Sequence, residues 1–207
     1  MTEPTDAGGS SPSLGRLIGD LGSLDRAYAL GHHGRWSAAR RAGIVDWGLS
    51  EVFDASDPPD GVALVALGGY GRGALSPGSD VDLLIVHDGA TPAAVAELAD
   101  DLLYPLWNVG LDVGHAVRTP AECVESSGRL DAATAMLDGR LLAGDGSVWE
   151  RAHAGVLQPI LADARGFAAR LVHDRGVRRG RFGSVSSLLE PDIKEGVGGL
   201  RDVHALG

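Results

Sequence analysis

The sequence predicts an α/β (α+β) protein in which a small mixed sheet is flanked by helices, with helical segments at the N- and C-terminal ends. Two short, apolar, β-branched runs, Val62 to Leu67 and Val81 to Val86, are bounded by turn residues, as buried strands are. Segments with apolar residues at helical spacing lie before and after these runs. A chain of 207 residues is long enough for one principal domain.

The composition is that of an ordinary globular protein, with 44% hydrophobic and 22% charged residues. A formal net charge of -10 argues against nucleic acid as a partner, because binding to phosphate backbones requires lysines and arginines. No apolar run is long enough to span a membrane, so a membrane is not an expected partner either. The single cysteine, Cys123, excludes an internal disulfide and is expected to be structural, and the N-terminus lacks a secretory signal. We therefore expect a cytoplasmic protein.

Four segments are expected along the chain. Residues 1–13 are rich in Gly, Ser, Pro and Thr and predict a flexible tail, whereas residues 14–54 predict a helical hairpin. Residues 62–119 predict a core in the order strand, strand, helix and strand. Its helix covers Pro92 to Trp107, and its third strand covers Gly110 to Thr119, where Gly114 is a candidate bulge.

The remaining residues, 131–207, predict a helical extension. Helices are expected over Asp131 to Ala143 and over Ser147 to Val172, followed by an irregular loop rich in glycine. The last residues resemble the beginning of a helix, so the chain is expected to be truncated within an element. The sequence contains no internal repeat. Together with the hairpin and the core, the extension is expected to form one domain over residues 14–207.

The turn between the first two strands fits two different phosphate-binding patterns. Gly69-Tyr70-Gly71-Arg72-Gly73-Ala74 satisfies the G-x-G-x-x-G/A dinucleotide fingerprint, and the acidic Asp88 follows Gly69 by 88 − 69 = 19 residues. That fingerprint requires a long crossover helix between two parallel strands. The segment Ser76-Pro77-Gly78 interrupts such a helix after a few residues. The sequence therefore excludes a Rossmann crossover and leaves room for one or two helical turns.

Two aspartates at the start of the second strand favour a metal-bound triphosphate instead. Asp80 and Asp82 are two residues apart, so their carboxylates lie on one face of the strand. Magnesium is typically held by one or two carboxylates together with substrate phosphates. The backbone amides of Gly68 and Gly69 are suited to hold those phosphates, and Asp112 in the third strand is the candidate third carboxylate.

Each of these features also has a plain structural explanation. The glycines can form a simple connection between strands, Asp80 can cap a turn, and Asp82 and Asp112 can be solvated surface residues. Their combination favours the metal site, because an acid in an otherwise apolar strand is costly without a partner.

The pattern of a Gly-Gly turn, an Asp-x-Asp pair and a later acid resembles the polymerase-β-like nucleotidyltransferase superfamily. More closely, three blocks resemble the N-terminal nucleotidyltransferase domain of the bifunctional PII uridylyltransferase/uridylyl-removing enzymes. These blocks are GGYGRGALSPGSDVDLLIV, LYPLWNVGLDVGHAVRT and LLEPDIKEGVGGLRD. They occur in the family's order from about Val62 to the end of the chain.

The resemblance implies transfer of UMP or AMP from UTP or ATP to a tyrosine of the PII nitrogen-regulatory protein, with release of pyrophosphate and with Mg²⁺ or Mn²⁺ as the cofactor. It implies that Asp80, Asp82 and Asp112 are catalytic and bind the metals. It also implies a nucleotide site, comprising Gly68, Gly69, Arg72, Ser79, Arg118 and Lys194. The two arginines can pair with phosphate oxygens or only balance the nearby acids. The loop around Lys194 can line the cleft or be packed for structural reasons.

The sequence departs from the full-length family, because the HD hydrolase domain, which removes the nucleotidyl group, and the ACT domains are absent from it. His173-Asp174 has no accompanying cluster of metal ligands, so removal activity is not expected. Two alternatives stay open: a truncated fragment that binds nucleotide without transferring it, and a nucleotidyltransferase with a different acceptor. The choice between UTP and ATP and the oligomeric state also stay open.

Overall fold

The computed structural model describes residues 12–31, 34–187 and 189–204, and the chain divides into two compact units, residues 1–156 and 157–207. The predicted tail lies outside the described residues except for Pro12 and Ser13, with which the first helix begins. The boundary between the units falls within the segment that the sequence assigns to a single helical extension.

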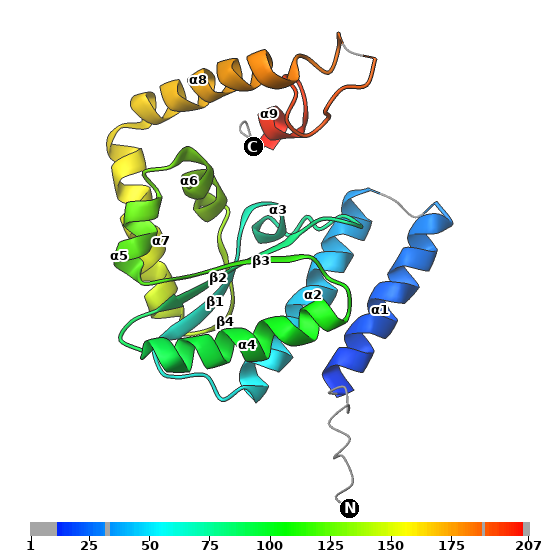
Figure 1. The fold of residues 1–207 in the computed structure, drawn as a ribbon, viewed down its shortest axis with the longest axis vertical. Helices are drawn as coiled ribbons and strands as arrows, with labels where there is room; N and C mark the ends of the chain where they lie inside the picture. The colour runs from blue at the N-terminus through cyan, green and yellow to red at the C-terminus, as the bar shows by residue number, and fades with distance from the viewer. Residues whose placement is uncertain (1–11, 32–33, 188, 205–207) are drawn as a thin grey trace, which may run out of the picture. The chain divides into compact units, whose positions relative to one another are not determined.

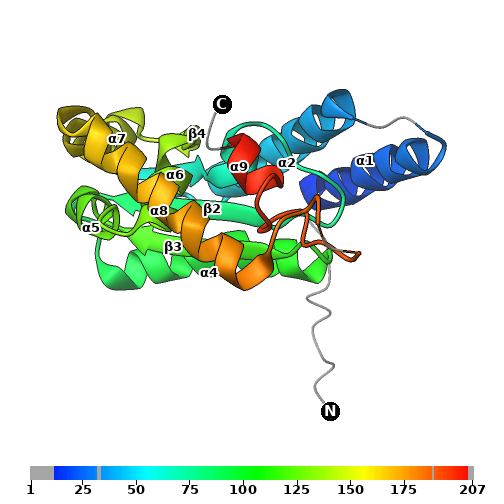
Figure 2. The same cartoon turned by 90° about the horizontal axis from the view of Figure 1, so that it is seen from above.

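The first unit begins with two helices, α1 (Pro12–Ala29) and α2 (Arg35–Ala55), which lie side by side (Figures 1 and 2). Their contact is close, because a Cβ at Gly48 of α2 would lie 3.0 Å from the Leu17 side chain of α1. An ion pair between Asp25 and Arg41 also links the two helices. The arrangement is the helical pair that the apolar spacing of residues 14–54 predicts.

A mixed sheet forms the centre of this unit, as the sequence predicts, but it has four strands and not the three expected. Its strands are β1 (Val62–Ala66), β2 (Val81–His87), β3 (Val113–Arg118) and β4 (Arg140–Gly144), in the order β3-β2-β1-β4. Strand β1 is antiparallel to both β2 and β4, whereas β2 and β3 are parallel. All five residues of β1 are buried, which accounts for its uninterrupted apolar sequence.

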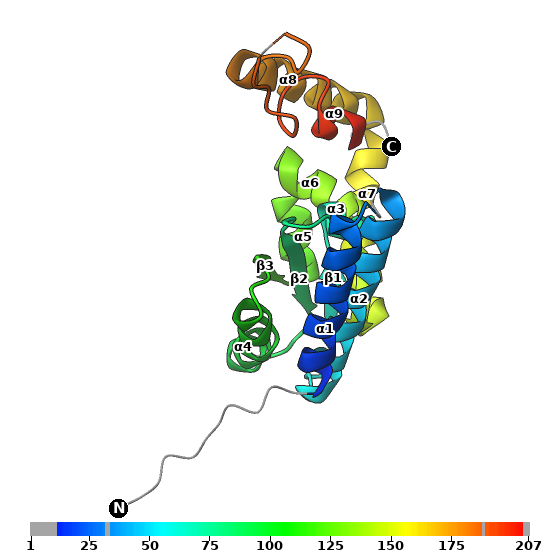
Figure 3. The same ribbon diagram turned by 90° about the vertical axis from the view of Figure 1, so that its right-hand side faces the viewer.

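Helices cover both faces of the sheet. Helix α4 (Pro92–Asn108) lies along one face, and α5 (Pro120–Ser126) and α6 (Leu130–Leu137) lie on the opposite face, as Figures 1 and 3 both show. Leu102 and Leu106 of α4 join Leu64 and Ile85 of the sheet in one apolar core. Helix α7 (Gly146–Ala162) follows β4 and buries Trp149 and Val156.

The prediction of a helix over Asp131 to Ala143 is wrong, because α6 ends at Leu137 and β4 occupies the second half of the segment. The chain turns at Gly139, where a Cβ would lie 2.5 Å from the Trp149 ring. Beyond this turn the backbone pairs with the free edge of β1, in the register Ala66 with Arg140 and Ala63 with Gly144. The pairing partner is distant in sequence, so local spacing does not reveal it.

Two predicted features of the third strand also need correction. The strand begins at Val113 and not at Gly110, because Gly110 adopts a φ of +81° as α4 ends and the Leu111 amide donates to the Leu106 carbonyl at 3.1 Å. Asp112 therefore precedes the strand. Gly114 is not a bulge, since β2 and β3 pair without a register shift and Gly114 lies opposite Asp82.

The second unit contains the end of α7, helix α8 (Ala164–Phe182) and helix α9 (Leu200–His204). The single helix predicted over Ser147 to Val172 is interrupted at Asp163, whose side chain caps α8 by accepting from the Gly166 amide at 2.9 Å. The loop after α8 is held to it by Arg178, which donates to Asp202 at 2.8 Å and to the Glu195 carbonyl at 3.0 Å. None of the described helices has the length and apolar character that crossing a bilayer requires.

Candidate functional site

The glycine turn that the sequence singles out forms α3 (Gly68–Gly71), a four-residue helix between β1 and β2. Because α3 is this short and the strands on either side are antiparallel, the turn does not belong to a dinucleotide-binding crossover. Gly68 has a φ of +53°, a conformation that favours glycine. The turn is anchored to the second strand by a hydrogen bond from the Leu67 amide to the Asp82 carbonyl at 2.9 Å.

Asp80 and Asp82 lie at the beginning of β2, beside this turn. Val81 between them is fully buried and both aspartates are exposed, so the alternation predicted from the sequence is present. The Asp82 carboxylate lies between two glycines. A Cβ at Gly68 would come within 3.7 Å of its Oδ2 atom, and a Cβ at Gly114 would come within 2.9 Å of its Oδ1 atom. A side chain at Gly114 would displace the carboxylate, whereas a Cβ at Gly68 would be in ordinary contact with it.

Asp112, the candidate third carboxylate, lies next to this pair in the sheet. Its carbonyl accepts from the Val81 amide at 2.8 Å, and its side chain is exposed. Asp112 directly precedes β3, and Gly114, two residues further along, lies opposite Asp82 in the sheet. Within the described part of the chain, however, no three His, Cys, Asp or Glu side chains are close enough together to hold a metal ion. The structure thus brings together the two aspartates and the glycine turn, with Asp112 at the margin.

The residues around Asp82 fit a magnesium–triphosphate group. Magnesium takes one or two protein carboxylates and draws its other ligands from phosphates and water, so Asp80 and Asp82 are a sufficient protein contribution. Gly68 and Gly114 themselves place no side chain beside the Asp82 carboxylate. The amides of Gly68 and Gly69 make no hydrogen bond among the described residues. The site therefore combines carboxylates for a cation with backbone donors for an anion.

Arg72 and Ser79 both follow the turn in the chain. Arg72 follows α3 and forms an ion pair with Asp138, the residue after α6, while its Nη2 atom lies 3.7 Å from the position of a Cβ on Gly69. The guanidinium is thus beside the turn and also balances a carboxylate, as both sequence interpretations allow. Ser79 directly precedes Asp80 and closes a turn through its amide, which donates to the Ser76 carbonyl at 3.0 Å.

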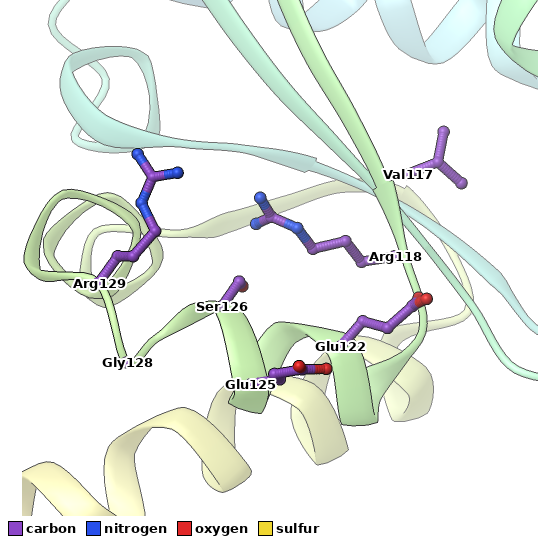
Figure 4. A pocket seen from close by; sticks show the side chains of 7 residues that line it. All are labelled: Val117, Arg118, Glu122, Glu125, Ser126, Gly128 and Arg129. Carbon is purple, nitrogen blue, oxygen red and sulfur yellow. The ribbon is translucent and has the colours of Figure 1, made fainter.

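Arg118 lies at the other end of β3 and is not brought to the aspartates. It is four residues beyond Gly114, a distance of roughly 13 Å along a strand. There it lines a pocket of about 590 Å³ with α5 and with Gly128 and Arg129, which precede α6. Figure 4 shows Arg118 and Arg129 reaching into this pocket from opposite sides. Glu122 on the pocket wall is occupied in a capping box with Thr119, which lowers the pKa of its carboxyl.

Lys194 belongs to the second unit, and its assignment to a nucleotide site stays a prediction. Its amide donates to Asp192 at 3.0 Å, and the Glu195 amide donates to the same oxygen at 2.8 Å. Asp202 accepts from Arg175 at 2.9 Å and from the Gly198 amide at 2.8 Å. Most of the charged groups in this block therefore stabilise their own loop.

Arg140 contacts the turn and is itself bound by Asp46, and neither residue is predicted from the sequence. Arg140 opens β4 and donates to the carbonyls of Tyr70 and Gly71 at 3.3 and 3.1 Å. It also forms a bidentate pair with Asp46 of α2, at 2.9 and 3.1 Å. No local sequence pattern indicates these two residues. The segment that contains Arg140 was predicted to be helical, and Asp46 lies on a helix that is distant in sequence.

Burial raises the pKa of two titratable side chains in the first unit. Burial, reinforced by the nearby Asp46 carboxylate, raises the pKa of the Tyr70 hydroxyl well above its ordinary value. The hydroxyl makes no hydrogen bond of good geometry to a described residue. Burial also raises the pKa of the Cys123 thiol to about 11, which is consistent with a structural cysteine.

Comparison with known protein families covers both units of the chain. Residues 49–130, which include the glycine turn and all three candidate carboxylates, match the family described as "Nucleotidyltransferase domain". Residues 166–207 match the family described as "GlnD PII-uridylyltransferase". The fold and the matched residues therefore define a nucleotidyltransferase domain.

Similar curated proteins identify the family more closely. The bifunctional uridylyltransferase/uridylyl-removing enzyme of Streptomyces coelicolor is 46% identical over 171 residues, which cover 80% of this chain and 20% of that protein. The enzymes of the same name from Methylococcus capsulatus and Vibrio atlanticus are 42% and 40% identical, over 81% and 76% of the chain and 19% and 18% of those proteins. The chain belongs to this family of bifunctional enzymes and spans about a fifth of the length of these relatives.

A solved structure described as "Crystal structure of the toxin-antitoxin with AMP-PNP" covers 59% of this chain and 98% of its own. Its sequence identity is 18% and its TM-score is 0.35, values too low to support an inference about this protein.

Proposed function

We propose that this chain transfers UMP from UTP, or AMP from ATP, to a tyrosine of the PII nitrogen-regulatory protein and releases pyrophosphate. The observation that carries the proposal is the Asp82 carboxylate, which lies between Gly68 and Gly114 with Asp80 two residues before it. The family match to residues 49–130 supports nucleotidyl transfer as the class of reaction. PII as the acceptor is inferred from the description of the family that matches residues 166–207.

In the proposed complex, Asp80 and Asp82 hold a divalent cation, Mg²⁺ or Mn²⁺, with Asp112 as the third carboxylate. When bound, the cation supplies positive charge that neutralises the triphosphate and favours ionisation of the acceptor hydroxyl. The amides of Gly68 and Gly69 donate to phosphate oxygens, which fixes the nucleotide relative to the carboxylates. Arg72 beside the turn adds a charged donor for the same phosphates, with Ser79 next to Asp80.

The reaction requires accurate placement more than covalent help from the protein, because phosphoryl transfer depends mainly on positioning and on neutralisation of charge. The bond that forms joins the acceptor tyrosine oxygen to the α-phosphorus of the nucleotide, and the bond that breaks releases pyrophosphate. Rigid backbone donors in the turn and carboxylates at the start of a buried strand meet that requirement.

The direct test combines the 207-residue chain, PII, magnesium and labelled UTP or ATP. We expect label to appear on PII, and we expect Asp80→Asn and Asp82→Asn to abolish it without loss of the folded state. Isothermal titration with each nucleotide runs in parallel. Nucleotide binding without transfer to competent PII would show that the chain is only a binding fragment. Undiminished transfer by both variants would refute the metal-site assignment.

A further inference from the structure

We infer that Arg140, held by Asp46, is a positioning residue that fixes the glycine turn in the conformation that receives the nucleotide. This inference rests on the proposed function and adds to it two residues outside the turn and outside the aspartate pair. Arg140 belongs to β4, Asp46 to α2 and the carbonyls that Arg140 contacts to α3. Three elements thus meet at one guanidinium group.

The contacts use most of the donors that an arginine has. Two N–H groups form the bidentate pair with Asp46, at 2.9 and 3.1 Å, and further donations reach Gly71 at 3.1 Å and Tyr70 at 3.3 Å. The guanidinium carbon also lies 5.7 Å from the centre of the Tyr70 ring. Only a planar fork can serve a carboxylate and two carbonyls at once, so a lysine would not reproduce this arrangement.

The carbonyls that Arg140 contacts belong to the end of α3, where helical carbonyls have no partner within the helix. The Tyr70 carbonyl also accepts from the Gly73 amide at 2.9 Å. Gly71 is also packed against backbone, because a Cβ there would lie 2.9 Å from the Ala66 carbonyl and would overlap that of Asp138. The turn is therefore fixed at its end by Arg140 and at its beginning by the bond from Leu67 to Asp82. Loss of Arg140 frees the end of the turn while leaving Asp80 and Asp82 in place.

The segment Asp138-Gly139-Arg140 acts on the turn as a unit. Asp138 pairs with Arg72 just after the turn, Arg140 contacts its last carbonyls, and Gly139 fits against Trp149. The short connection between α6 and β4 thus supports the turn through Asp138 at the beginning of the connection and Arg140 at its end. Arg140 does not contact the nucleotide in this proposal and acts only through the turn.

The test measures the Kd of Mg-UTP and Mg-ATP by titration calorimetry, together with the Tm, for the whole 207-residue chain. We expect Arg140→Met to raise the Kd of the bound nucleotide by on the order of tenfold, the loss typical of outer-shell partners. The control is Asp25→Asn, which breaks the pair with Arg41 between α1 and α2, far from the turn in sequence. This control is expected to lower the Tm and to leave the Kd unchanged.

A second variant separates positioning from stability. Arg140→Met combined with Asp46→Asn leaves no unpaired charge, so it is expected to recover part of the Tm while the Kd stays raised. An unchanged Kd in the Arg140→Met variant, or full recovery of the Kd in the double variant, would overturn the inference and leave the proposed function intact. A wild-type chain that binds neither nucleotide would overturn both.

Discussion

Replacement of Gly114 by alanine tests the Asp82 site with the smallest possible change. A Cβ at this position would lie 2.9 Å from Asp82 Oδ1, whereas ordinary van der Waals contact begins at 3.4 Å. The carboxylate must therefore move by about 0.5 Å, which is 3.4 − 2.9. Functional groups in a preorganised site must be held within about 0.5 Å of their productive positions, and a misplacement of about 1 Å costs on the order of 100-fold in rate. We expect kcat/KM for transfer to fall roughly tenfold, or about 1.4 kcal/mol.

The same substitution should leave stability intact. The displaced atom is the end of a side chain, and alanine removes the entropic disadvantage of glycine in a strand, which is roughly 0.5–1 kcal/mol. The assay is label transfer from UTP or ATP to PII, with thermal unfolding measured in parallel. Gly43→Ala is the matched control, because Gly43 is exposed and a Cβ there has no neighbour within 4 Å. Full activity of Gly114→Ala would refute the view that this glycine makes room for the Asp82 carboxylate.

Three further predictions concern packing and titration. Gly71→Ala forces the turn away from the Asp138 backbone, so we expect urea unfolding to show a loss of about 1–3 kcal/mol; unchanged stability would contradict the packing. Cys123, with its buried thiol and a pKa of about 11, should react with a thiol reagent at pH 7.5 only after denaturation, and rapid labelling of native chain would disprove its burial. Burial alone would raise the pKa of Asp202, but hydrogen bonds from Gly198, Arg175 and Arg178 lower it to about 2. Because the folded pKa is below the unfolded value, its stabilisation is present above about pH 4 and is lost toward pH 2. Asp202→Asn should flatten this acid dependence in unfolding measured across the range, and an unaltered profile would exclude Asp202 as its source.

Local sequence was sufficient for the features that depend on neighbouring residues. The apolar runs of β1 and β2, the short connection between them and the alternation of Asp80, Val81 and Asp82 all follow from residues within the same short segment. Pro77 ruled out a long crossover helix for the same reason. These features also placed the candidate site at the glycine turn.

Prediction failed where structure depends on contacts between distant segments. The residues of β4, RLLAG, have no clear period, and they form a strand because β1 offers them an unpaired edge. Arg118 of β3 and Asp82 of β2 lie on the same face of the sheet but near opposite ends of these two strands. Their separation depends on the register of β2 against β3. The third strand was predicted to begin at Gly110, whereas it begins at Val113. The prediction was too long because polar Asp112 next to apolar Val113 shows the alternation that is typical of a strand.

The sequence by itself therefore determined the class of fold and the turn with its aspartate pair, because each is encoded by residues a few positions apart. Only the tertiary structure decided which residues support that turn. Arg140 lies 94 residues from Asp46 and 69 from Gly71, and the chain brings them together only when β4 pairs with β1. Side-chain hydrogen bonds over such separations leave no periodic signal in the sequence, since their geometry arises only after the sheet has formed.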